Sequence, residues 1–248
     1  MVNASASNIE WQAYAELDYG ASHDLAAGLA EWALLKSHLT QYGLDRMATA
    51  VEVGCGGGRL TNAVARDFDV VNALDVAPHR IEQARKVPNA RKVNFHLVSN
   101  PVIPLPDAVA DFCISTHVFQ HIADVRVTEA YLAEMFRVLR PGGCILVHIP
   151  VIGAHGMTGE WWEVTRRRVK EGIKEVVLAG TRLLMKSGLR RLPWKVDQYH
   201  VFNFPRLSAF LARVGYVDVE LRLLPWDGGH SYILARKPAR AGDPSLPR

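Results

Sequence analysis

Hydrophobic residues along the chain alternate between short continuous runs and longer stretches with helical spacing. Continuous runs are typical of strands buried on both faces, and spaced stretches are typical of helices that cover a sheet. The first part of this pattern predicts strands at 48–53, 70–74, 93–98, 112–115 and 144–149, and helices at 59–66, 78–86 and 125–139. This alternation predicts a doubly wound α/β architecture with a parallel sheet.

The pattern extends beyond this core at both ends. Helical spacing over 9–42 predicts one or two N-terminal helices that end near Gly43. The alternation stops at Gly153 and resumes as a helix at 205–214 and strands at 217–223 and 231–235. We therefore expect a Rossmann-like sheet of seven strands, mostly parallel with an antiparallel last strand, and a helical insertion after the fifth strand.

One domain is expected, because 248 residues of which 49% are apolar can bury one substantial core. Residues 1–46 would be N-terminal helices that close the site, and 47–236 would form the domain, with 153–204 as a helical insertion or lid. The Pro- and Ala-rich 237–248 would be a flexible tail. Within the domain, Arg140-Pro141-Gly142-Gly143 predicts a turn that stops one helix and leads into the next strand.

A glycine-rich loop carries the first functional signal. Gly54, Gly56 and Gly58 follow a predicted strand and open a helix, so backbone can approach a ligand there. In a dinucleotide fingerprint the third glycine would stand where this chain has Arg59. Asp75 ends the next strand and could accept two hydrogen bonds from a ribose diol. The loop and Asp75 together predict a cofactor that contains ribose.

These residues, with two segments downstream, resemble the class I methyltransferases that depend on S-adenosylmethionine (SAM). The acidic-x-Gly-x-Gly-x-Gly motif of that family matches 52–58, and the two segments are 111–122 and 136–143. The resemblance covers about 50–149 and 205–235 and implies SAM as the methyl donor. The cofactor-binding residues that we expect are Glu52, Gly54, Cys55, Gly56, Gly58, Asp75, Val76, Asn100, Ser115 and Thr116.

Some of these positions have a simpler structural interpretation. Many relatives have Asp where this chain has Asn100, but the Asn side-chain oxygen can also accept a hydrogen bond from adenine. Glu52 could cap or pair near the loop, and Asp75 could be the N-cap of the helix that begins at Pro78.

Three histidines are candidates for a general base. His117 and His121 follow the fourth strand of the domain and His148 ends the fifth, and ligands of open α/β sheets bind at such strand ends. A hydroxyl acceptor must lose its proton, and imidazole is suited to take it near neutral pH. The resemblance also supports His121, which matches a histidine that recurs in the family. Each histidine could instead hold a loop, and Asp124 is expected to cap a helix.

The acceptor side of the site is predicted from aromatic residues and charge. Trp161 and Trp162 in the insertion, with Tyr14 from the N-terminal helices, could wall an acceptor pocket. Residues 160–195 carry ten Lys or Arg and four Glu. This basic face could be solvated, attract an acidic acceptor, or contact an anionic membrane. A nucleic-acid partner is not expected, because no RNA-binding motif accompanies the charge.

The remaining composition bears on location and assembly. Cys55, Cys113 and Cys144 lie in apolar runs without metal-ligand spacing, which fits a reduced cytoplasmic protein with no metal site. No signal peptide or membrane span is predicted from the sequence. The expected partner is a small-molecule acceptor, and the sequence leaves open whether the protein forms a homodimer.

These features predict a SAM-dependent methyltransferase that acts on a small or medium-sized acceptor, at a hydroxyl oxygen of a sugar, lipid intermediate or secondary metabolite. N- or C-methylation, a non-catalytic SAM-binding subunit and a nucleotide-dependent oxidoreductase are the alternatives.

Overall fold

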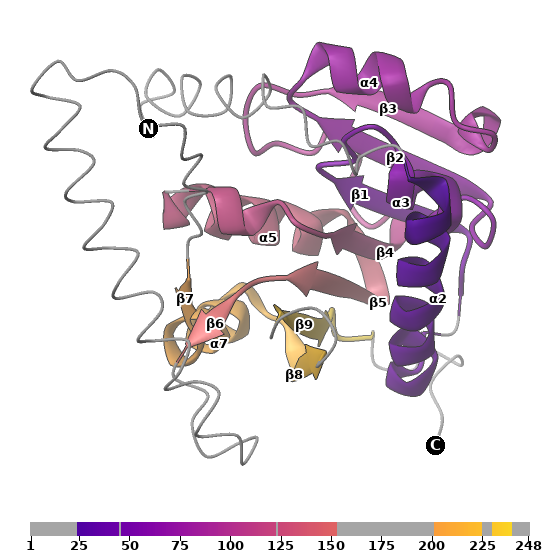
Figure 1. Ribbon diagram of the computed structural model, residues 1–248. Coiled ribbons are helices and arrows are strands. Elements are labelled where there is room, and N and C mark those ends of the chain that lie inside the picture. The colour runs from indigo at the N-terminus through magenta and orange to yellow at the C-terminus, as the bar shows by residue number, and fades with distance from the viewer. Residues whose placement is uncertain (1–23, 45, 123, 153–200, 225–229, 240–248) are drawn as a thin grey trace, which may run out of the picture.

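The computed structural model describes residues 24–44, 46–122, 124–152, 201–224 and 230–239, and shows the predicted doubly wound sheet (Figure 1). Seven strands lie in the order β3-β2-β1-β4-β5-β9-β8. Strands β3, β2, β1, β4 and β5 pair in parallel, and β9 pairs antiparallel with both β5 and β8. The strands are β1 (Thr49–Val53), β2 (Val70–Asp75), β3 (Val93–Leu97), β4 (Ala110–Ser115), β5 (Leu139–His148), β8 (Val217–Leu224) and β9 (His230–Arg236). The seven-stranded, mostly parallel sheet is therefore confirmed.

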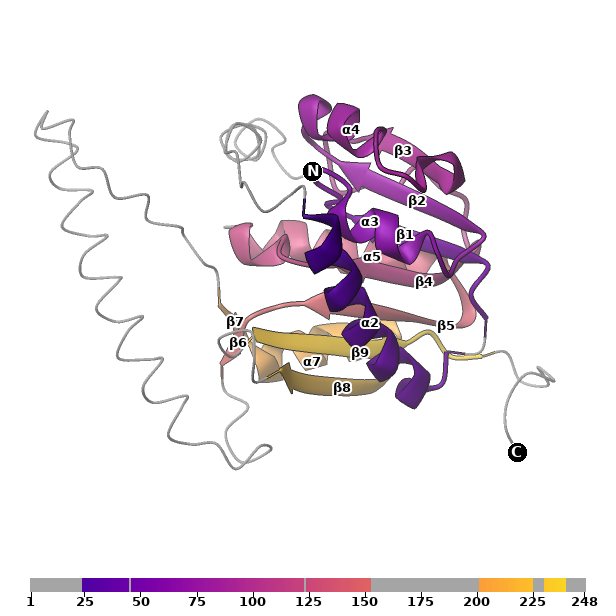
Figure 2. The same ribbon diagram turned by 45° about the vertical axis from the view of Figure 1, so that its right-hand side comes forward.

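Helices cover both faces of this sheet (Figures 1 and 2). Side chains of α2 (Leu25–Tyr42), α3 (Arg59–Val64) and α4 (Pro78–Ala84) belong to one hydrophobic cluster, which includes Ala50. Those of α5 (Val125–Val138) and α7 (Phe204–Val214) belong to a second cluster, which includes Val51. Neighbouring strand residues point to opposite faces, so these two clusters are the two sides of the sheet. The short elements are η2 (Ala90–Lys92), η3 (Phe119–His121), β6 (Val151–Ile152) and β7 (Phe202–Asn203).

The helix ends follow the local sequence. Asp24 is the N-cap of α2 and accepts from the backbone N–H of Ala27, and the helix ends at Gly43 with a φ of 82°. The positive φ favours glycine, which explains why the helix ends where the sequence predicted. Asp124 caps α5 by accepting from the N–H of Arg126, so its expected capping role is confirmed.

The segment Arg140-Pro141-Gly142-Gly143 differs from the prediction. We expected a turn between helix and strand, but β5 begins at Leu139, directly after α5, and includes these four residues. The pairing of β4 with β5 shifts register between the pairs Ala110–Leu139 and Phe112–Cys144, so the extra residues are accommodated as an irregularity within the strand. The prediction of a separate turn was therefore wrong.

Lys237, which we assigned to the tail, continues the hydrogen bonding of this region. Its backbone N–H donates to the carbonyl of Gly143, and its Nζ donates to the carbonyls of Phe136 and Leu139. The ordered hydrogen bonding of the sheet therefore extends at least one residue beyond the end of β9.

Several sequence predictions lie outside the described residues. These are Tyr14, Trp161 and Trp162, most of the insertion at 153–204, the N-terminal residues 1–23 and the tail from 240 onward. Across the ranges that the structure does describe, no helix is long and apolar enough to cross a membrane.

Asp111 fastens the end of the sheet opposite the strand carboxyl ends. Its Oδ2 accepts from the backbone N–H groups of Ala48 and Thr49 at 3.0 and 2.7 Å, and its Oδ1 accepts from Arg140. The Asp111 side chain is only 2% exposed. A carboxylate buried in this way is stabilised by its partners, and its removal would take away the acceptor of Arg140 Nε and of two backbone N–H groups.

We predict that Asp111→Asn lowers the free energy of unfolding by about 3 kcal/mol, because it breaks a buried charge pair. Urea denaturation measures the loss. Asp107→Asn is the matched control: Asp107 pairs with Arg137 at 2.7 Å but its side chain is 75% exposed. Its substitution should cost less than about 1 kcal/mol. Equal losses for the two variants would contradict an anchoring role for Asp111.

Candidate functional site

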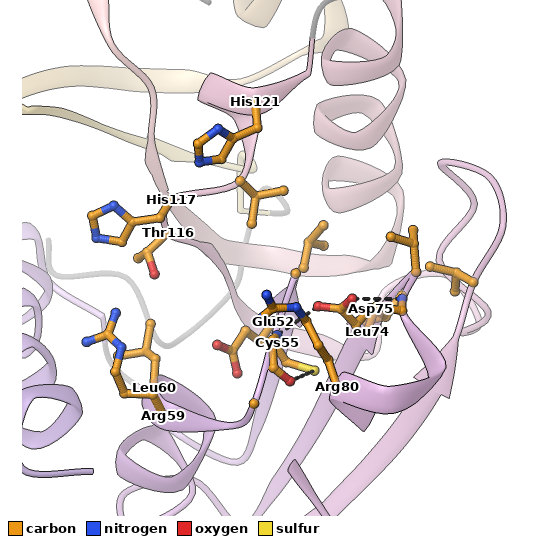
Figure 3. A pocket seen from close by; sticks show the side chains of 18 of the residues that line it. Glu52, Cys55, Arg59, Leu60, Leu74, Asp75, Arg80, Thr116, His117 and His121 are labelled. Atoms are coloured by element: carbon orange, nitrogen blue, oxygen red, sulfur yellow. Dashed lines mark hydrogen bonds between the residues drawn. The ribbon is translucent and has the colours of Figure 1, made fainter. Parts of the chain in front are cut away.

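A cavity opens at the carboxyl ends of β1, β2 and β4 (Figure 3). From β1 the sheet extends through β2 in one direction and through β4 in the other, and ligands bind at such a reversal in open α/β sheets. The cavity has a volume of about 440 Å³, within the range of small-molecule sites. Its wall includes Asp24 and Ala27 of α2, the loop 54–57, residues 74–77, residues 116–118 with 120 and 121, and Tyr131 of α5.

The three predicted glycines of the loop have different structural roles. Gly54 has a φ of 78°, and a Cβ there would lie 2.2 Å from Val118 Cγ2. Gly56 has a φ of 53° and lines the cavity. Gly58, with a φ of 86°, does not line it; a Cβ there would lie 3.0 Å from the Cα of Ala84. Gly58 therefore serves the packing of α3 on α4, whereas Gly54 and Gly56 shape the cavity.

Asp75 connects the end of β2 to this loop. Its Oδ2 accepts from the N–H of Gly56 at 2.7 Å and its Oδ1 accepts from the N–H of Ala77 at 2.9 Å. The residue is 8% exposed and lines the cavity. Each carboxylate oxygen has two lone pairs, so Asp75 can hold the loop and still accept hydrogen bonds from a ligand.

Glu52 is a buried acid at the cavity wall. It is 2% exposed, and burial raises the pKa of its carboxyl to about 7. Its Oε2 is buried and has no hydrogen-bond partner among the described residues. A buried carboxylate oxygen without a hydrogen-bond partner is suited to a cationic group of a ligand. Such a group would donate to the oxygen and favour the ionised form of Glu52.

The three candidate histidines are not equivalent. His117 and His121 line the cavity, and His148 does not. His148 is fully buried, its Nδ1 accepts from the backbone N–H of His117 at 3.2 Å, and its ring lies 5.1 Å from that of Tyr232. A ring nitrogen of His121 lies 3.1 Å from the side-chain amide of Gln120. The structure therefore gives His148 a supporting position behind His117.

Of the other predicted cofactor-binding residues, some line the cavity and some do not. Cys55, Val76 and Thr116 line the cavity, and burial raises the pKa of the Cys55 thiol. Ser115 and Asn100 do not line it. The hydroxyl of Ser115 donates to the carbonyl of Val53 at 2.9 Å, and the exposed Asn100 accepts from the N–H of Val102 at 3.1 Å. Both side chains serve local structure here.

Sequence reasoning missed an ion cluster at the cavity. Glu31 of α2, 7% exposed, pairs with Arg59, and its Oε1 lies 3.6 Å from Nε2 of His117. Burial alone would raise the pKa of Glu31, but His117 and Arg59 outweigh it and hold that pKa below its usual value. Arg59 drew notice only as the residue in place of a third glycine, and no motif marked Glu31.

Comparison with known proteins shows which family the central part of the chain matches. A family model described as a methyltransferase domain matches residues 51–147. The malonyl-[acyl-carrier protein] O-methyltransferase of Serratia marcescens is 35% identical over 115 residues, which are 46% of this chain and 42% of that protein. An O-methyltransferase of Pyrenophora dematioidea is 35% identical over 97 residues, 37% of this chain and 35% of that protein. The chain thus spans less than half the length of these two curated relatives.

Residues 51–147 are a class I SAM-dependent methyltransferase domain.

Solved structures share the fold of this methyltransferase domain. One is a chain from the complex between the Haloferax volcanii Trm112 methyltransferase activator and a methyltransferase, with a TM-score of 0.61 and 16% identity over 94% of this chain and 98% of that chain. Another is a Haemonchus contortus phosphoethanolamine N-methyltransferase in complex with S-adenosylhomocysteine, with a TM-score of 0.57 and 16% identity, covering 84% of this chain and 53% of that chain. At these identities the likeness concerns the fold alone.

The cavity of the methyltransferase domain fits SAM, the cofactor of its family. SAM has a ribose diol, an ammonium group and a sulfonium. Asp75 lines the cavity and has lone pairs that could accept from the diol, and the buried Oε2 of Glu52 is suited to the ammonium group. Gly56 leaves the backbone open to the ligand, since a Cβ there would have only the far end of Arg80 within 4 Å.

We predict that SAM binds the methyltransferase domain more tightly as the pH rises from 6 to 8. Below a pKa of about 7 Glu52 is protonated and neutral, so binding of a cationic group must first remove that proton. The SAM affinity, measured by titration calorimetry, should rise by up to about ten-fold per pH unit and level off above the pKa.

Glu52→Gln should bind SAM more weakly, and its affinity should not change with pH in this range. Glu82→Gln, which changes an exposed acid on α4, is the matched control and should keep the wild-type profile. A pH-dependent affinity that survives in Glu52→Gln would assign the titration to another group.

Proposed function

We propose that this protein transfers the methyl group of SAM to a hydroxyl oxygen of a small or medium-sized acceptor. The observation that carries this proposal is that His117 and His121 line the same cavity as Asp75 and the glycine loop. Figure 3 draws the two imidazoles on one side of this cavity and Asp75 on the other. The two imidazoles and the proposed cofactor residues thus line one cavity, which suits transfer to a nucleophile that must lose a proton.

The cofactor side of the cavity would hold SAM through Asp75, Glu52 and the backbone of residues 54–57. Bound SAM would supply a methyl carbon attached to a sulfonium. The nucleophile would attack this carbon in line, and the sulfur would be the leaving group. The protein has to align the acceptor and exclude water from the cavity. Tyr131, 3% exposed and packed at 6.1 Å from the ring of Phe119, belongs to the wall that limits water on the α5 side.

His117 is the better placed of the two imidazoles to act as the base. Its Nε2 faces the Glu31 carboxylate at 3.6 Å, whereas a ring nitrogen of His121 lies 3.1 Å from the neutral amide of Gln120. A carboxylate partner stabilises the imidazolium that forms when a histidine takes a proton, and an amide does so less. We therefore assign proton removal to His117 and a supporting or acceptor-binding role to His121.

A carboxylate acceptor is the second candidate, favoured by the likeness to a malonyl-[acyl-carrier protein] O-methyltransferase. A carboxylate is already ionised near neutral pH and needs no base. The two candidates therefore differ in whether turnover depends on His117.

Transfer of labelled methyl groups from SAM tests the proposal. Separate acceptor pools would contain phenols, sugar hydroxyls, malonyl-acyl carrier protein and amines. Labelling of a hydroxyl acceptor supports the proposal, and labelling of the malonyl group alone supports the second candidate. Labelling of amines alone, or of no pool while SAM still binds, would overturn both.

With a hydroxyl acceptor, we predict that His117→Ala lowers kcat by about 100-fold, the usual size for loss of a general base. His121→Ala should lower kcat less. Both variants should bind S-adenosylhomocysteine as the wild type does, because neither histidine is assigned to the cofactor. Steady-state kinetics and calorimetry measure the two effects, and an unchanged kcat in His117→Ala would rule out the assigned base.

A further inference from the structure

His117 is held in an unusual backbone conformation. Its φ is 58°, in the left-handed region, which residues other than glycine adopt at a cost and which recurs at functional sites. The backbone N–H of His117 donates to Nδ1 of the buried His148, and the two rings lie 4.8 Å apart. Support from β5 therefore fixes the main chain of His117, but it does not by itself fix the side chain.

The side chain of His117 meets Glu31, which comes from a different part of the fold. Glu31 lies on α2, and its side chain is 7% exposed, whereas that of His117 is 37% exposed. The distance of 3.6 Å between Oε1 and Nε2 joins a buried acid to an imidazole at the cavity wall. A buried carboxylate needs charged partners to offset its desolvation cost, and the imidazole of His117 lies beside Oε1 of Glu31.

Arg59 keeps Glu31 charged. Its guanidinium pairs with Oε2 of Glu31, while Oε1 faces Nε2 of His117 at 3.6 Å. The acids Asp24, Glu52 and Asp75 also line the cavity, as does Arg80 on α4. Negative charge on these acids would disfavour the ionised form of Glu31, and the positive charge of Arg59 at the start of α3 offsets this effect.

Helix α2 holds Glu31 in a fixed place. Gly28, one turn earlier, lies so near α3 that a Cβ there would be 2.3 Å from the carbonyl oxygen of Arg59. Trp32 donates from Nε1 to Asp67 at 2.6 Å, and Lys36 donates to the same carboxylate at 2.6 Å. A glycine contact before Glu31 and two anchored side chains after it leave the carboxylate little freedom to move.

We propose that Glu31 is a positioning residue for His117 in methyl transfer. The carboxylate faces Nε2 of His117, and the imidazole held in this way takes the proton of the acceptor hydroxyl. As the acceptor oxygen forms its bond to the methyl carbon, the electron pair of the breaking carbon–sulfur bond stays on sulfur. Glu31 then stabilises the imidazolium until the proton passes to water. This inference rests on the proposed transfer to a hydroxyl group.

The first test needs no acceptor. Diethyl pyrocarbonate modifies imidazole nitrogens, and peptide mass spectrometry gives the rate for each histidine. In Glu31→Ala, His117 should react about five-fold faster than in the wild type, because the carboxylate that faces Nε2 is removed and the reagent can reach this nitrogen. Glu31→Gln should be intermediate, and the exposed His79 serves as an internal reference whose rate should not change. An unchanged rate at His117 would overturn the proposal.

The second test separates positioning from stability. With the hydroxyl acceptor found by labelling, Glu31→Gln should lower kcat by about ten-fold or more, with KM and the affinity for S-adenosylhomocysteine unchanged. Lys36→Gln is the matched control, since it removes an anchor of α2 without touching His117. An equal fall in kcat for Lys36→Gln, or no fall for Glu31→Gln, would overturn the proposal.

The two tests also distinguish this inference from the proposed function. If no hydroxyl acceptor is methylated, the proposed function fails, and the modification rate of His117 still reports whether Glu31 holds it. If a hydroxyl acceptor is methylated and the rate at His117 does not depend on Glu31, only the positioning role fails.

Discussion

The paired hydrogen bonds that Asp75 accepts from Gly56 and Ala77 are the constraint on which the cavity depends. A loop with glycines at 54, 56, 57 and 58 has a wide range of accessible conformations, and ordering it costs entropy. The hydrogen bonds to Asp75 order the loop before a ligand binds. The carbonyl of Leu74 contributes, because it accepts from the N–H groups of Gly54 and Cys55. A ligand that binds afterwards meets a loop already in place.

Two buried acids beside this loop have opposite electrostatic states. Glu31 has Arg59 and His117 as partners, and its pKa lies below the usual value. Glu52 has a buried oxygen without such a partner, and burial raises its pKa to about 7. Environment alone separates the two carboxyls, as it does in many sites where acids have different roles. One acid is suited to a permanent charge beside an imidazole, and the other is suited to a charge that appears with a cationic ligand.

Much of the fold could be predicted from the sequence, because parallel strands and amphipathic helices have distinct periodicities. The glycine loop and Asp75 could also be predicted, since strand ends converge at one edge of such a sheet. The strand irregularity at Arg140-Pro141-Gly142-Gly143 could not, because glycine and proline mark a break without saying whether the strand pairing continues through it. Asn100 and Ser115 were expected at the ligand. Asn100 instead accepts from the nearby N–H of Val102, and Ser115 donates to Val53, which only the folded sheet brings within reach.

Glu31 could not be predicted for a further reason, which also explains how the site is built. Its position depends on how α2 docks against α3, and that docking depends on Gly28 and on the contact of Trp32 with Asp67, Phe68 and Phe112, none of which forms a motif with Glu31. Helix α2 thereby joins the two halves of the cavity. Through Glu31 it contacts Arg59, which begins the helix after the glycine loop, and His117, which follows β4. Since one rigid helix contacts both halves, a displacement on the cofactor side would also move the partner of the imidazole, and the ordered loop and the held histidine depend on the same packing.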